Sequence, residues 1–195
     1  VFRVIYSVPI EIDGDSVGKW FVASNVARSG EWGAIGGDHH QLRWSIMLPQ
    51  ILVAKILPWR YENYYVLPML FYSLFTMICM VVLLTGLKKR EWLGVLLLAV
   101  TICIDPISHV MASQLKTVAF GLFYFVLGVL GFLYYLECRR VWVLALSAGL
   151  FFFAYGAHIT YIIFSLAPLL VLTIHLKEYR TAGVFLAMLL FLFAA

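Results

Sequence analysis

The sequence predicts an all-α protein: a polytopic transmembrane helical bundle with an external loop that carries interfacial helices. Hydrophobic residues make up 64% of the chain and charged residues only 12%, about half the charged share of an average soluble protein. Too little polar surface therefore remains to cover a soluble fold. Several apolar runs also approach or exceed the roughly 20 residues that a helix needs to cross a bilayer.

The first elements are an apolar stub and a polar loop. Residues 1–10 predict the outer end of a first helix, and residues 11–43 form the longest polar passage of the chain. Within this loop apolar side chains recur at spacings of three and four: Val17, Trp20, Phe21, Ala23 and Ala27. This spacing predicts a short amphipathic helix lying in the membrane interface, and Gly30 is expected to end it.

The remaining elements are apolar. Segment 44–58 is short and is interrupted by Pro49 and Lys55, so we expect it to be re-entrant or interfacial. Membrane spans are predicted at about 64–87, 91–112, 118–137, 141–157, 159–176 and from 181 onward. We expect one transmembrane domain over 1–195, without a separate soluble domain, as the N-terminal portion of a longer protein.

Basic clusters indicate the orientation of these spans. They fall at every second span end: 88–90, Arg139 with Arg140, and Lys177 with Arg180. By the positive-inside rule these ends are cytoplasmic. Loop 11–43 and the turns near 105–117 and 155–160 then face outward, from an inner or plasma membrane. The net charge of +4 resides largely in such clusters, so we expect no nucleic-acid partner.

Asp13 and Asp15 are the first candidate site residues. Two carboxylates this close together at a membrane surface suit a general base or a divalent-cation site. The alternative is structural, because Asp15 or Ser16 could cap the interfacial helix.

A second polar cluster, Asp38, His39, His40 and Arg43, precedes the short apolar segment. Histidine and arginine here are suited to bind phosphate groups, to which arginine donates two parallel hydrogen bonds. A His-His-Asp metal site and a solvated polar anchor are the alternatives. Further ionisable groups on the outward face either bind a ligand or extend to the interface as packing residues: Arg60, Glu62, Asp105, His109 and Lys116.

The order of these features resembles the N-terminal half of the C-type integral-membrane glycosyltransferases, such as lipid A aminoarabinose transferases and protein O-mannosyltransferases. The matching features span nearly the whole chain: Arg3, Ile-Asp-Gly-Asp-Ser (12–16), Arg-Ser-Gly-Glu-Trp (28–32), Asp-His-His-Gln-Leu-Arg-Trp (38–44) with Pro49, and Asp-Pro-Ile-Ser-His-Val-Met-Ala-Ser-Gln (105–114). The chain lacks the family's Pro-Pro pair and a second acid beside Asp15.

The resemblance implies an enzyme that transfers a sugar from a polyprenyl-phosphate donor to a lipid, glycan or protein acceptor at the outer face. By its spacing to Gly-Glu-Trp (30–32), Asp15 matches the family's catalytic aspartate. It would act as the base, and Asp13 would assist it. The implied phosphate or acceptor contacts are His39, His40, Arg43 and Lys116. A divalent cation is the only cofactor that the acidic motif suggests.

Two other classes of protein are compatible with the same sequence. A secondary transporter would hold functional polar groups near the bilayer midplane, often at broken helices. A non-catalytic membrane subunit would use the loop for structure alone. The concentration of ionisable groups at span ends favours the transferase.

Overall fold

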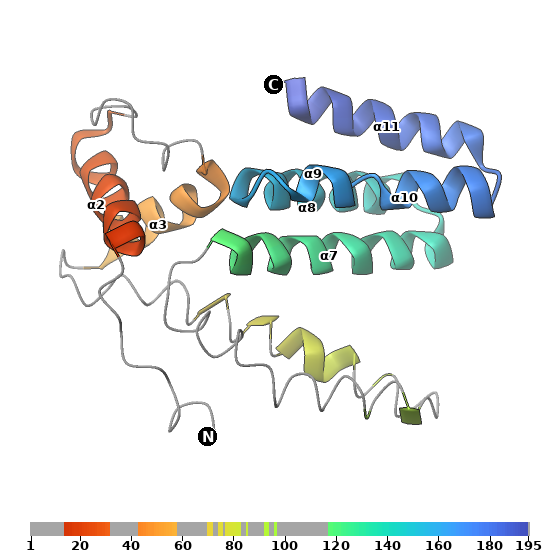
Figure 1. Ribbon diagram of the computed structural model, residues 1–195, viewed down its shortest axis with the longest axis horizontal. Coiled ribbons are helices and arrows are strands. Elements are labelled where there is room, and N and C mark those ends of the chain that lie inside the picture. Colours follow the sequence, from red (N-terminus) through yellow and green to blue (C-terminus); the bar gives the residue numbers. More distant parts are fainter. Residues whose placement is uncertain are drawn as a thin grey trace. The chain divides into compact units, whose positions relative to one another are not determined.

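The computed structural model describes residues 14–31, 43–57 and 117–194, and scattered helical positions between 70 and 96. These parts contain helices and turns and no strand (Figure 1), which confirms the all-α prediction. Two compact units are present. The first comprises Val1–Gln41 with Met47–Ala119, and the second comprises Leu42–Ile46 with Phe120–Ala195.

Helix α2 (Gly14–Ser29) is the helix predicted within the polar loop. It ends as expected at Gly30, which adopts a left-handed φ of 73°. The amide of Gly30 donates to the carbonyl of Val26 at 2.9 Å, and glycine tolerates this conformation because it has no Cβ. Among the described side chains of the predicted apolar face, Phe21 departs from the prediction and is 51% exposed.

Helix α3 (Trp44–Ile56) matches the short apolar segment. Its 13 residues extend about 20 Å, less than the roughly 30 Å of a bilayer core. Within the first unit α3 packs on α2 through one apolar cluster: Val22, Ala23, Met47 and Ile51. Pro49 lies inside the helix and does not end it.

Two antiparallel helices, α7 (Thr117–Cys138) and α8 (Val141–Ala157), form much of the second unit, which includes α7 from Phe120 onward. These bounds agree with two predicted spans. The helices approach closely at Gly128, whose carbonyl accepts a 2.7 Å hydrogen bond from the hydroxyl of Ser147. A Cβ at Gly128 would lie 3.1 Å from the ring of Phe151. Glycine therefore makes room for a ring that is fully buried.

The predicted span 159–176 is helical but interrupted. It consists of α9 (Tyr161–Phe164), α10 (Ala167–Leu170) and the π-helical turn η3 (Val171–His175). Two hydroxyls bond to backbone carbonyls along it: Ser165 donates to the carbonyl of Ile162 at 2.6 Å, and Thr173 donates to that of Leu169 at 2.7 Å. Such side-chain bonds stabilise departures from the regular helical ladder.

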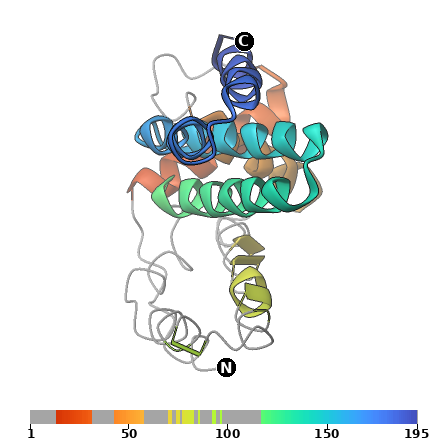
Figure 2. The same ribbon diagram turned by 90° about the vertical axis from the view of Figure 1, so that its right-hand side faces the viewer.

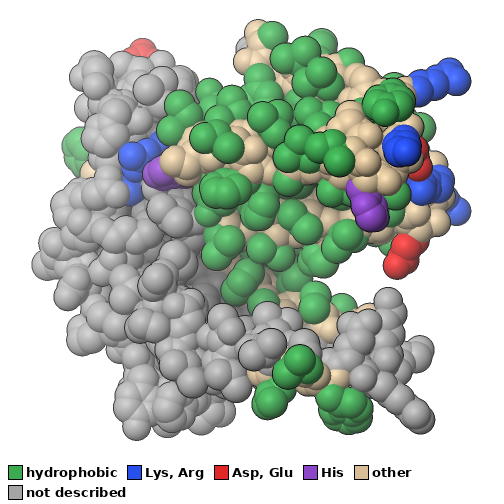
Figure 3. All heavy atoms as spheres, turned by 45° about the vertical axis from the view of Figure 1, so that its right-hand side comes forward, with side chains coloured by type: hydrophobic (Ala, Val, Ile, Leu, Met, Phe, Trp, Pro, Cys, Tyr) green, Lys and Arg blue, Asp and Glu red, His purple; other side chains and the backbone are tan. Residues whose placement is uncertain are grey.

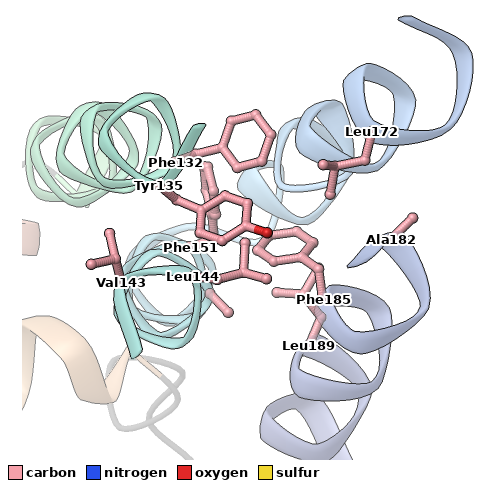
Figure 4. Packing of buried hydrophobic residues seen from close by; sticks show 10 residues of the cluster. Phe132, Tyr135, Val143, Leu144, Phe151, Leu172, Ala182, Phe185 and Leu189 are labelled. Atoms are coloured by element: carbon pink, nitrogen blue, oxygen red, sulfur yellow. The ribbon is translucent and has the colours of Figure 1, made fainter. Parts of the chain in front are cut away.

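The last helix, α11 (Tyr179–Ala194), packs against α8 and closes the core of the second unit. Figure 4 shows side chains from α7, α8, η3 and α11 meeting in this core. The buried cluster comprises Phe132, Tyr135, Val143, Leu144, Ala148, Phe151, Leu172, Ala182, Phe185 and Leu189.

Two turns meet at one end of this unit (Figures 1 and 2). The guanidinium of Arg139, in the α7–α8 turn, donates to both carboxylate oxygens of Glu178, in the η3–α11 turn, at 2.6 and 2.8 Å. The ion pair brings together two of the predicted basic clusters. It also raises the pKa of Arg139, chiefly through the hydrogen bond to Glu178.

Among the described residues, one helix is long and apolar enough to cross a bilayer, over Phe120–Cys138 of α7. The other apolar helices are shorter: Trp44–Ile56, Val141–Ala157, Tyr161–His175 and Tyr179–Ala194.

Candidate functional site

The predicted site residues fall mostly in parts of the chain that the structure does not describe. Asp13, His39, His40 and Lys116 lie outside the described residues. Asp15 lies in the first turn of α2, where only its backbone is described, and Arg43 immediately precedes α3. The helix begins at Gly14, so Asp15 lies inside it and is not its N-terminal cap.

Lys19 is a buried basic residue of α2 that the sequence interpretation did not single out. Its side chain is 0% exposed, although lysine is almost never fully buried unless it is paired. Positions 19, 23 and 26–27 share one face of α2, because residues three and four apart are neighbours on a helix. That face packs on α3 through Ala23 and its neighbours. Spacing could have indicated Lys19, which follows Asp15 by four residues and thus shares its side of α2.

Helix α3 contributes a buried amide to the same unit. Gln50 is 0% exposed, between Pro49 and the core residue Ile51. Neither its Nε2 nor its Oε1 has a hydrogen-bond partner within the described structure. An unsatisfied buried polar group costs about 1–3 kcal/mol. The α2–α3 pair therefore buries a lysine, and it also buries an amide whose own bonding capacity is unused.

The start of α3 is fixed within the second unit. The indole of Trp44 lies 4.7 Å from the ring of Phe152 and 5.1 Å from that of Phe153, measured between centroids. A Cβ at Gly156 would come within 2.5 Å of this indole, so glycine is required for the close approach. These contacts attach the residues just after the polar loop to the last turns of α8.

A hydrogen bond explains why Pro49 does not break α3. Proline has no backbone N–H, so it leaves the carbonyl four residues earlier without its helical donor. That carbonyl belongs to Ser45, and the hydroxyl of Tyr124 donates to it at 3.1 Å. Tyr124 is 8% exposed. A side chain of α7 thus replaces the backbone donor that the sequence removes from α3.

His158, at the end of α8, contacts neighbouring residues of the turn that follows this helix. Its Nδ1 lies 2.8 Å from the hydroxyl of Thr160, and its amide donates to the carbonyl of Ala154. Its ring also packs edge-on against Tyr161. Within the ranges that the structure describes, no group of three or more His, Cys, Asp or Glu side chains could hold a metal ion.

The chain matches no protein-family model, no curated protein and no solved structure.

Proposed function

We propose that the protein is a multi-pass membrane glycosyltransferase that uses a polyprenyl-phosphate sugar donor at the outer membrane face. The observation that carries the proposal is the complete burial of Lys19, one helical turn after Asp15. Such a reaction needs a base and an anion-binding group, and α2 carries a carboxylate and a cation four positions apart in sequence.

The surface of the second unit supports a membrane setting. Large apolar side chains cover the sides of its helices (Figure 3). Those more than half exposed include Leu133, Leu146, Ile159, Ile163, Phe164, Leu170, Ile174, Leu190 and Phe191. Soluble monomers rarely expose apolar surface on this scale. The shorter helices would then cross the membrane beside α7.

The positions of the turns support the proposed orientation. The basic residues Arg139 and Arg140 lie at the start of α8, whereas Trp44 packs near its last turn, at Gly156. If the basic turns face the cytoplasm, as the positive-inside rule expects, the segment that follows the polar loop lies at the external end of α8. A lipid-linked donor would meet its acceptor at that face.

The proposed reaction is a displacement at the anomeric carbon of the donor. Asp15 takes the proton of the acceptor hydroxyl, whose oxygen forms a bond to the anomeric carbon. The bond between that carbon and the phosphate oxygen breaks, and polyprenyl phosphate leaves. Lys19 stabilises the charge on the departing phosphate. Gln50 offers its amide to hydroxyl or phosphate oxygens. Asp13 remains a predicted assistant to the base, and His39, His40, Arg43 and Lys116 remain predicted phosphate or acceptor contacts.

The experiment measures donor binding and sugar transfer in membranes that contain the protein. Replacing Asp15 with Asn should abolish transfer, by about 10²–10⁴-fold, and leave donor binding intact. Replacing Lys19 with Met should weaken donor binding, and Lys19→Arg should retain it because the charge remains. Lys55, exposed near the end of α3, provides the matched control through Lys55→Met. Transfer that persists in Asp15→Asn would refute the assignment.

A transporter is the second candidate, and one observation favours it. The segment 161–175 is broken into three short helical pieces, one of them π-helical, and Ser165 is fully buried within it. Broken helices mark the binding sites of many transporters, and π-helical turns are frequent at functional sites. Uptake of a solute into vesicles by the Asp15→Asn variant, without any sugar transfer by the wild type, would favour this alternative.

A further inference from the structure

The end of the second unit that carries the α7–α8 and η3–α11 turns has excess positive charge. Arg139, Arg140, Lys177 and Arg180 are all exposed there, and several charged side chains gather over these turns in Figure 3. Glu137 and Glu178 are the acidic residues of the two turns. Four basic residues against two acidic ones leave a surplus of two positive charges.

The four basic side chains have different environments. Arg139 is engaged by both carboxylate oxygens of Glu178. Arg140, Lys177 and Arg180 have no acidic partner within the described part of the chain. The Arg139–Glu178 pair therefore serves to join the two turns, and it holds the other three cations on one surface.

Exposed aromatic side chains accompany these cations. Trp142, in the first turn of α8, is 59% exposed, and Tyr179, the first residue of α11, is 68% exposed. Trp and Tyr favour the headgroup level of a membrane, where the ring meets apolar tails and the polar edge meets water. Long basic side chains beside them reach the phosphates.

We propose that this end of the bundle binds the anionic phospholipid headgroups of the adjacent leaflet. Arg140, Lys177 and Arg180 contact the lipid phosphates, and Trp142 and Tyr179 lie at headgroup depth. The inference rests on the membrane setting of the proposed function and is independent of the transfer reaction, because all of these residues lie far along the chain from Asp15 and Lys19. A lipid surface, unlike a soluble anion, accounts for the aromatic side chains as well as the cations.

The experiment measures lipid selectivity in bilayers. The protein is reconstituted in phosphatidylcholine with a small amount of spin-labelled phosphatidylglycerol or spin-labelled phosphatidylcholine, and the association constants of the two labels are compared. Wild type should prefer phosphatidylglycerol several-fold, since each basic residue near an anionic surface contributes up to about fivefold. The triple variant Arg140→Gln/Lys177→Gln/Arg180→Gln should lose this preference.

Two comparisons make the test decisive. Lys55→Gln removes a charge elsewhere in the chain and should keep the preference, as should the charge-preserving variant Arg140→Lys/Arg180→Lys. If the triple variant does not fold, the wild-type protein is measured in concentrated salt instead. About 1 M salt reduces the Debye length to about 3 Å and should abolish the preference for phosphatidylglycerol. A preference retained by the triple variant or in concentrated salt, or lost equally in Lys55→Gln, would overturn the proposal.

Discussion

The hydrogen bond between Tyr124 and Ser45 allows a sharp test of how α3 tolerates its proline. Replacing Tyr124 with Phe removes only the hydroxyl that donates to the carbonyl at 3.1 Å. A hydrogen bond contributes a net 0.5–1.5 kcal/mol, whereas a buried acceptor left without a donor costs about 1–3 kcal/mol. Tyr124 is 8% exposed and Ser45 is fully buried, so we expect a loss of about 1–2 kcal/mol in the free energy of unfolding.

The assay is thermal unfolding of the purified protein in detergent. A loss of 1–2 kcal/mol should lower Tm by roughly 2–8 °C for a chain of this size. Tyr134→Phe is the matched control, because Tyr134 is 53% exposed on the same helix, and its Tm should not change.

A double-mutant cycle tests the role assigned to Pro49. Pro49→Ala restores a backbone N–H that can donate to the carbonyl of Ser45. In that background Tyr124→Phe should cost about 1 kcal/mol less than in the wild type, because the carbonyl keeps a donor. An equal cost in both backgrounds would show that the hydroxyl of Tyr124 does not replace the missing amide.

Three further predictions concern packing and charge in the second unit. Gly156→Ala should lower the free energy of unfolding by about 1–3 kcal/mol, because the new Cβ would come within 2.5 Å of the indole at the start of α3. As a control, Gly149→Ala should not be destabilising, because a Cβ at Gly149 meets nothing within 4 Å. Equal Tm values for the two variants would contradict this packing. Phe151→Ala should cost about 3–5 kcal/mol, since this ring is fully buried, whereas Phe191→Ala, at 75% exposure, should cost little; chemical denaturation compares the two. The ion pair between Arg139 and Glu178 should contribute the same stability from about pH 7 to about pH 10. The pKa of Arg139 is raised above an already high value, and the contribution is lost only when the pH rises past the pKa of Arg139 in the folded protein. A fall in Tm over this range that Arg139→Gln removes would disprove this.

The local features of the sequence were sufficient to predict most helix bounds. The predicted span 141–157 is α8, and the basic pairs near Arg139 and Lys177 lie at the turns where the charge pattern places them. Gly30 ends α2 as expected. These features are local, because apolar run length, charge and glycine act on the backbone within a few residues.

The candidate site was predicted only in part. The sequence indicated Asp15 and the helix that carries it, but it did not indicate the burial of Lys19 or of the amide of Gln50. Burial of a polar side chain depends on which helix covers it, and the packing of α3 on α2 has no signature in either segment alone.

By itself, then, the amino-acid order determined a strongly apolar chain, the helical character of its described part, several of the places where those helices stop, and the acidic and basic groups available for chemistry. Tertiary structure alone decided whether Pro49 would break α3. The outcome depends on the hydroxyl of Tyr124, 79 residues away in sequence, and a hydrogen bond over that separation exists only after the helices have packed.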